Sequence, residues 1–205
     1  MKRFVVCFVM LVISIGFIAS KPSSSILELA GSYGTYSVSD SSSTTEHTAG
    51  FSFKSYGKAN ESDTFGFVGG GVIQMPLSLT LNGVTSNPSY RYAVNVILNA
   101  GMWKGFNLSD SADMVVSGGF ALKEIARVTY YTKVLAFDVG AFANASIRYW
   151  TIDNVAISAG INALAYLAEY AYFETTSSST TGFTEDFFAY ELIPYIAGTI
   201  YIPMK

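Results

Sequence analysis

The sequence predicts an all-β protein: a closed, antiparallel, up-and-down transmembrane β-barrel of about eight strands, preceded by a cleaved signal peptide. Three observations favour this fold. Apolar and polar residues alternate along several segments, an apolar run follows two basic residues near the start, and 13% of the residues are charged whereas 50% are hydrophobic. Soluble domains carry about 25% charged residues, so this chain has too few charges to cover an ordinary soluble surface.

The first 20 residues are predicted to be the signal peptide, because Lys2 and Arg3 precede an apolar run that ends in small residues. An uncleaved anchor is the alternative, but the apolar stretch is short for about 30 Å of hydrocarbon. Cys7 lies inside this run, so the mature chain would contain no cysteine for a disulfide or a metal site. We therefore expect a signal peptide at 1–20 and one β-barrel domain at 21–205.

The clearest alternation runs from Tyr90 to Asn99. Successive side chains of a strand point to opposite faces, so one face would be apolar and the other small or polar. The apolar set is Tyr90, Tyr92, Val94, Val96 and Leu98, and the other set is Arg91, Ala93, Asn95, Ile97 and Asn99. Alternation alone also fits a soluble barrel with an apolar interior. The low charge content favours the opposite arrangement, with the apolar stripe facing lipid.

Similar patterns predict eight strands, and an even number closes a sheet with both chain ends on one side, which we take as periplasmic. The predicted strands are 25–38, 47–56, 64–75, 88–100, 112–123, 130–148, 154–172 and 185–203. The outer connections are then 39–46, 75–88, 124–128 and 174–183. Two of them contain serine and threonine tracts, at 41–45 and 175–181. Such tracts are typical of flexible solvated loops or of exposed binding surfaces.

The segment 155–173 is also compatible with a membrane-spanning helix, because it is apolar and Glu169 is its one charge. Gly160 and Asn162 favour a strand instead. As a strand, the segment would send Ser158, Gly160 and Asn162 inward. Glu169 would then have to lie beyond the hydrocarbon, or a β-bulge would have to reverse the alternation before it.

If the apolar stripes face lipid, a set of polar side chains turns into the barrel lumen. A buried charge is costly unless it is paired or hydrated, so the acidic and basic members are expected to meet. Such a network would either close the lumen or form a polar conduit or gate. The predicted members are Glu28, Lys54, Gln74, Arg91, Asn95, Asn99, Asp138, Asn144, Arg148 and Glu191.

Few residues suggest catalysis or ligand chemistry. His47 is the single histidine and follows Glu46, a pair that could support acyl transfer near the first outer connection. An exposed loop histidine is the simpler interpretation, and no metal or cofactor motif is present. Without Lys2 and Arg3 the chain has 10 basic and 15 acidic residues, a net charge of −5. Nucleic acid is therefore excluded as an expected partner.

The chain resembles the small eight-stranded bacterial outer-membrane proteins that include the OmpA membrane domain, OmpX and OmpW. The resemblance is architectural and covers nearly the whole mature chain. It rests on the signal, the two-faced strands, the polar outer connections and a final strand containing 194–201. It implies location in the bacterial outer membrane, with membrane lipid and the outer-membrane assembly machinery as partners.

From the resemblance and the residues together we expect a surface protein with a structural or host- or environment-facing role and a closed polar lumen. Its serine- and threonine-rich connections would contact external ligands. The alternative is an OmpW-like channel for small molecules, hydrophobic ones included. A third hypothesis is a lipid-modifying enzyme that uses His47, although no catalytic pattern of such enzymes is found in the sequence. No cofactor is expected.

Overall fold

The computed structural model describes residues 24–38, 44–58, 64–87, 89–184 and 187–203. The predicted signal peptide at 1–20 lies outside these residues. No helix in the described ranges is long and apolar enough to cross a membrane.

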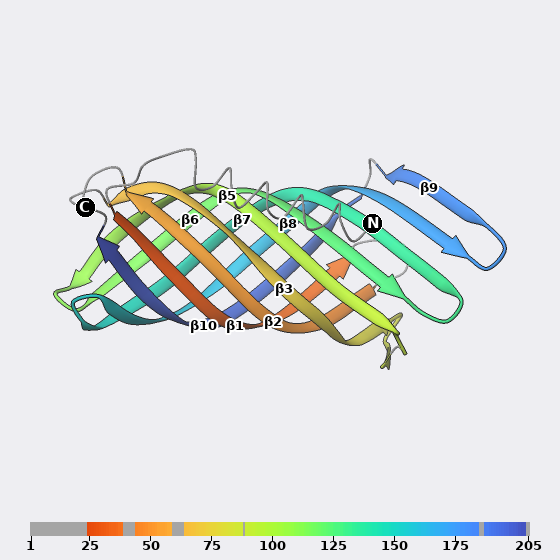
Figure 1. Ribbon diagram of the computed structural model, residues 1–205, viewed down its shortest axis with the longest axis horizontal. Coiled ribbons are helices and arrows are strands. Elements are labelled where there is room, and N and C mark those ends of the chain that lie inside the picture. Colours follow the sequence, from red (N-terminus) through yellow and green to blue (C-terminus); the bar gives the residue numbers. More distant parts are fainter. Residues whose placement is uncertain (1–23, 39–43, 59–63, 88, 185–186, 204–205) are drawn as a thin grey trace.

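Eight long antiparallel strands form a closed ring in the order β1, β2, β3, β5, β6, β7, β8 and β10, and β10 pairs with β1 to complete it (Figure 1). The predicted fold class is thus confirmed, and 155–173 is a strand. The eight strands are β1 (Ser24–Val38), β2 (Thr44–Lys58), β3 (Phe65–Leu81), β5 (Tyr92–Ser109), β6 (Ala112–Val128), β7 (Thr132–Ile152), β8 (Val155–Thr175) and β10 (Ala189–Pro203).

Two short strands extend hairpins at one end of the barrel. β4 (Val84–Ser86) pairs with β3, and β9 (Ser179–Thr184) pairs with β8. The β3–β4 turn contains Asn82 and Gly83, both with positive φ, at 49° and 81°. Asn-Gly is the pair that a two-residue hairpin turn of this kind prefers. The turn lies within the outer connection predicted at 75–88.

The two ends of the barrel differ. We call the end that carries Ser24, Pro203 and the turns at 110–111 and 153–154 the turn end, and the opposite end, which carries β4 and β9, the loop end (Figure 1, left and right). β7 and β8 have 21 residues each. At about 3.3 Å per residue and a tilt of about 40°, such a strand rises about 53 Å. The apolar band of an outer-membrane barrel is about 25 Å tall, so these strands project beyond it.

The outer wall of the barrel is apolar. β10 shows the pattern most plainly, because its residues are alternately buried and exposed from Ala189 to Ile200. Phe51, Phe120 and Ile196 are between 70% and 81% exposed on the outer faces of three different strands. Large apolar side chains over a whole wall are unfavourable in water and favourable in hydrocarbon. The apolar stripes therefore face lipid, as the charge content predicted.

β8 contains a β-bulge at Leu167. Asp138 pairs with Glu169, and Val139 with Ala168, but Gly140 pairs with Tyr166, so Leu167 has no partner on β7. One extra residue reverses the alternation of side chains. Glu169 therefore faces the lumen beside Asp138, whereas regular alternation would have turned it toward lipid.

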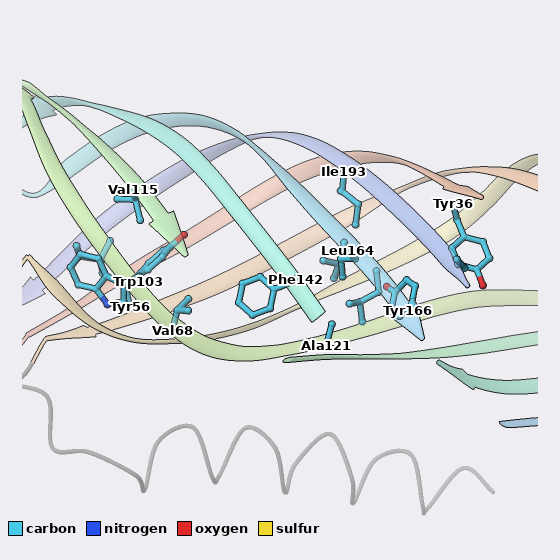
Figure 2. Close-up of a cluster of buried hydrophobic side chains, with 14 residues drawn as sticks. Tyr36, Tyr56, Val68, Trp103, Val115, Ala121, Phe142, Leu164, Tyr166 and Ile193 are labelled. Carbon is cyan, nitrogen blue, oxygen red and sulfur yellow. The ribbon is translucent and has the colours of Figure 1, made fainter. Parts of the chain in front are cut away.

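The interior also contains bulky apolar side chains. Figure 2 shows Tyr56 and Trp103 together on one side of the view, Tyr36 and Tyr166 on the other, and Phe142 and Leu164 between them. We had expected a lumen of small and polar residues. Instead, aromatic rings fill it near both ends and alternate with the polar groups described next.

Candidate functional site

Three hydrogen-bonded contacts cross the lumen between strands that lie three positions apart in the ring. The Tyr36 hydroxyl on β1 donates to Asp138 Oδ2 on β7 at 3.0 Å. Lys123 Nζ on β6 donates to Glu191 Oε2 on β10 at 2.8 Å. Arg127 Nη2 on β6 donates to both carboxylate oxygens of Glu46 on β2 at 2.7 Å. Opposite strands of an eight-stranded ring are four positions apart, so these links traverse nearly the full width of the lumen.

Lys123 lies at the centre of one group of lumen contacts, which also includes Tyr36, Tyr166 and Glu191. Its ammonium nitrogen is 3.3 Å from the ring centroid of Tyr36 and 5.6 Å from that of Tyr166, and its side chain is fully buried. The Tyr166 hydroxyl donates to the same Glu191 oxygen that accepts from Lys123. Aromatic faces and a carboxylate therefore replace the water that would otherwise solvate the ammonium.

Arg127 and Glu46 form a second closure nearer the loop end. Arg127 Nη1 donates to the backbone oxygens of Val94 and Ala126, and Asn95 Nδ2 donates to Glu46 Oε2 at 3.1 Å. Both charged side chains are buried. With this many donors already satisfied, the arginine is held in one position across the lumen.

The middle of the lumen holds Lys54 and Glu28. Lys54 Nζ lies 3.6 Å from Glu28 Oε1 and 4.0 Å from the ring centroid of Tyr195. The Ser158 hydroxyl donates to the other Glu28 oxygen at 3.0 Å. Asn144 connects the same layer to its neighbours, because its Nδ2 donates to Asn162 Oδ1 and to the Tyr195 hydroxyl.

The residues predicted to line the lumen fall into two groups in the structure. Nine of them are buried inside the barrel: Glu28, Lys54, Gln74, Asn95, Asn99, Asp138, Asn144, Arg148 and Glu191. Most of these make the contacts above, and Arg148 Nε donates to Asp113 Oδ1 at 2.7 Å toward the turn end.

Arg91 is the exception, and its predicted inward position is wrong. It precedes β5 at the loop end and is exposed, with its guanidinium carbon 4.6 Å from the ring centroid of Tyr130. Its backbone nitrogen donates to Val128 O. Arg91 is an even number of residues from Asn95 and Asn99, so regular alternation would put all three on the same face. Arg91 lies beyond the closed ring, however, where the inward face is no longer buried.

Several lumen residues were not predicted: Tyr36, Glu46, Lys123 and Arg127. Glu169 reaches the lumen through the β-bulge that was one of the two alternatives for it. Glu46 and Arg127 had been assigned to outer connections, but the strands extend further and carry both side chains inward. Lys123 ended a predicted strand. It is two residues from Ala121, so the two side chains point to the same face of the strand, and this spacing was the signal that would have placed Lys123 in the lumen.

His47 lies on the outer face of β2, and Glu46 lies on the inner face. The Tyr33 hydroxyl is 2.8 Å from His47 Nδ1, and the two rings stack with centroids 5.9 Å apart. Glu46 binds Arg127 on the other side of the sheet. The structure therefore separates the two side chains that the enzymatic hypothesis would combine. Among the described residues, no group of three or more His, Cys, Asp or Glu side chains is arranged to hold a metal ion.

The closed ring, the apolar wall and the buried polar lumen together define the class: a small eight-stranded β-barrel of the outer-membrane type. The predicted resemblance to the OmpA, OmpX and OmpW class is confirmed at this level of architecture.

Comparison with solved structures agrees with this class. The outer membrane protein OprG from Pseudomonas aeruginosa is 7% identical, with a TM-score of 0.61 and coverage of 89% of this chain and 97% of OprG. Neisserial surface protein A is 12% identical, with a TM-score of 0.53 and coverage of 88% of this chain and 97% of that protein. No protein-family model and no curated protein matches the sequence. At these identities, the similarity concerns the fold.

Proposed function

We propose that this protein is a closed outer-membrane barrel that acts at the cell surface, in a structural role or in contact with a host or the environment, and not as an open pore. The observation that carries the proposal is the set of cross-lumen links, Tyr36 to Asp138, Lys123 to Glu191 and Arg127 to Glu46. A passing solute would have to separate buried charged groups. Breaking a buried ion pair by removing one partner costs about 3–5 kcal/mol.

The surface role is supported by the loop end. The β8–β9 hairpin projects past the ring, and all six residues of β9 are exposed. Serine and threonine hydroxyls dominate this hairpin, which offers hydrogen-bonding groups without a strong charge. In the proposed orientation the loop end faces outward, lipid surrounds the wall, and the outer-membrane assembly machinery inserts the barrel. The proposal includes no enzymatic role, since His47 and Glu46 lie on opposite faces of β2.

The test is conductance in a planar bilayer. The purified wild-type barrel is expected to show no sustained conductance. A variant with both Lys123→Ala and Glu191→Ala is expected to show brief openings, which the remaining Arg127–Glu46 closure limits. The matched control is Lys133→Ala with Glu174→Ala, which removes an exposed ion pair outside the ring. Robust, selective flux through the wild type would contradict a closed lumen.

A second function, a lateral port for small hydrophobic molecules, is favoured by one observation. Pairing between β1 and β10 stops after Ser32 opposite Tyr195 and resumes at Thr35 opposite Leu192. Pro194 lies in this interval and has no amide hydrogen to donate. If the port operates here, vesicles containing the protein should take up naphthalene faster than empty vesicles, and Pro194→Leu should slow uptake. Equal uptake by all three preparations would remove this candidate.

A further inference from the structure

A pocket of about 210 Å³ opens at the turn end of the barrel, away from the cross-lumen links. Residues of β1, β2, β5, β6, β7 and β10 line it, so it lies across the mouth of the ring. Its walls combine cationic and aromatic side chains with one buried ion pair, and the lining includes Lys58, Trp103, Asp113, Arg148, Trp150 and Tyr201.

The guanidinium of Arg148 has a hydrogen-bond donor without an acceptor. Its side chain is 3% exposed, and its Nε donates to Asp113 Oδ1 at 2.7 Å. The other oxygen of Asp113 accepts from Trp150 Nε1 at 2.9 Å. Asp113 therefore has a donor on each oxygen, whereas Arg148 Nη1 is buried with no hydrogen-bond partner. An unsatisfied buried donor on a charged group is costly, and a carboxylate or phosphate is the acceptor that a guanidinium binds best.

The aromatic residues give the pocket an apolar side. Lys58 Nζ lies 5.9 Å from the ring centroids of both Trp103 and Tyr201, which places a second cation against aromatic faces. The Arg148 guanidinium carbon is 5.7 Å from the Trp150 ring centroid. Aspartates are present too, but Asp113 is bonded as described and Asp153 is exposed on the β7–β8 turn. A ligand with one anionic group and a flat apolar body matches both kinds of wall.

We propose that this pocket binds a small organic anion, with its carboxylate or phosphate at Arg148 and Lys58 and its apolar body against the indole rings. The proposal does not depend on whether the lumen conducts. It assigns a ligand site to the turn end, which faces the periplasm in the proposed orientation, whereas the proposed surface role concerns the loop end.

The chain itself provides the readout, because it has two tryptophans and both line this pocket. The folded full barrel in detergent is titrated with benzoate, and with the similarly shaped benzamide and benzylamine as neutral and cationic probes, while tryptophan fluorescence is recorded. We expect a saturable change with benzoate and none with the other two. Inorganic phosphate is expected to bind more weakly than benzoate, because it lacks an apolar body.

Arg148→Gln is expected to weaken benzoate binding at least about tenfold, the effect of losing roughly 1.5–3 kcal/mol of charged hydrogen bonding. Lys58→Gln on another wall tests the same site if the first variant does not fold. Lys133→Gln, at the loop end, is the matched control and should bind like the wild type. The absence of a saturable benzoate signal, equal or tighter binding of benzamide or benzylamine, or unchanged affinity in both pocket variants would overturn the proposal. Phosphate binding as tightly as benzoate would overturn the assignment of an apolar body.

Discussion

Lys123 and Glu191 form a 2.8 Å ion pair between β6 and β10, and neither side chain has any solvent-exposed surface. Lys133 and Glu174 form a pair of nearly the same length, 2.9 Å, but their side chains are 57% and 35% exposed. The two pairs thus contain the same chemical groups in opposite environments. In the first pair, each charge depends on its partner because water cannot replace it. In the second pair, water can solvate either charge when the other is removed.

This contrast predicts that Lys123→Met destabilises the barrel by about 3–5 kcal/mol, because it leaves the Glu191 carboxylate buried without its cation. Adding Glu191→Gln should recover part of the loss, since the uncompensated charge is then removed. The measurement is urea unfolding of the barrel in lipid vesicles. Lys133→Met is the control and should leave the unfolding midpoint nearly unchanged. Equal effects of Lys123→Met and Lys133→Met would contradict the structural role of the buried pair.

The strands were predictable because the lipid-facing and lumen-facing residues differ in polarity, and this difference repeats every two residues. The prediction failed at 124–128, where Glu124 interrupts the apolar stripe. Glu124 faces outward and pairs with Val96 and Phe137 in register. The predicted outer connection at 124–128 contains Arg127, so this residue was missed as a lumen residue.

The lumen contacts were less predictable than the strands. Alternation places a side chain inside the barrel, but it does not say which residue lies opposite, because that depends on strand tilt and register. Glu28 and Lys54 are cross-strand neighbours on β1 and β2. Knowledge of the register between these two strands would have been enough to predict their contact. Lys123 and Glu191 are 68 residues apart and belong to strands that do not touch in the sheet. No local pattern reports such a contact.

Deletion of Leu167 is predicted to be tolerated. Because Leu167 is the unpaired residue of the bulge, its removal lets Tyr166, Ala168 and Glu169 pair regularly with β7 while Glu169 stays inside the lumen. The variant should fold into a barrel that resists detergent until heated, as shown by a heat-dependent shift in gel mobility. Deletion of Ile161, which has a partner on β7, should abolish this shift, since it turns one part of β8 inside out. Loss of folding in the Leu167 variant alone would show that the bulge itself is required.

Gly50→Ala is predicted to destabilise the barrel by about 1–3 kcal/mol, the usual cost of overpacking. A Cβ at this position would collide with the backbone oxygen of Ile73 and lie 2.7 Å from Cα of Gln74. Both are backbone atoms of the adjacent strand, so neither can move without disturbing the ladder. Gly31→Ala is the control, because no atom lies within 4 Å of the added Cβ. Urea unfolding should separate the two variants, and similar midpoints would refute the predicted close approach of β2 and β3.

The part of the β7–β8 pair that extends beyond the ring at the loop end is predicted to loosen in acid. Lys133 Nζ and the Tyr172 hydroxyl donate to Glu174, and these hydrogen bonds hold the pKa of Glu174 below its ordinary value of 4.5. A carboxyl group with a lowered pKa contributes stability above the ordinary value, and this contribution is lost as the pH falls through the lowered one. Amide hydrogen exchange, corrected for its intrinsic pH dependence, should therefore show less protection at the loop-end termini of β7 and β8 when the pH is below the lowered pKa of Glu174. Glu174→Gln should remove the pH dependence, and protection that does not change with pH in the wild type would exclude this role for Glu174.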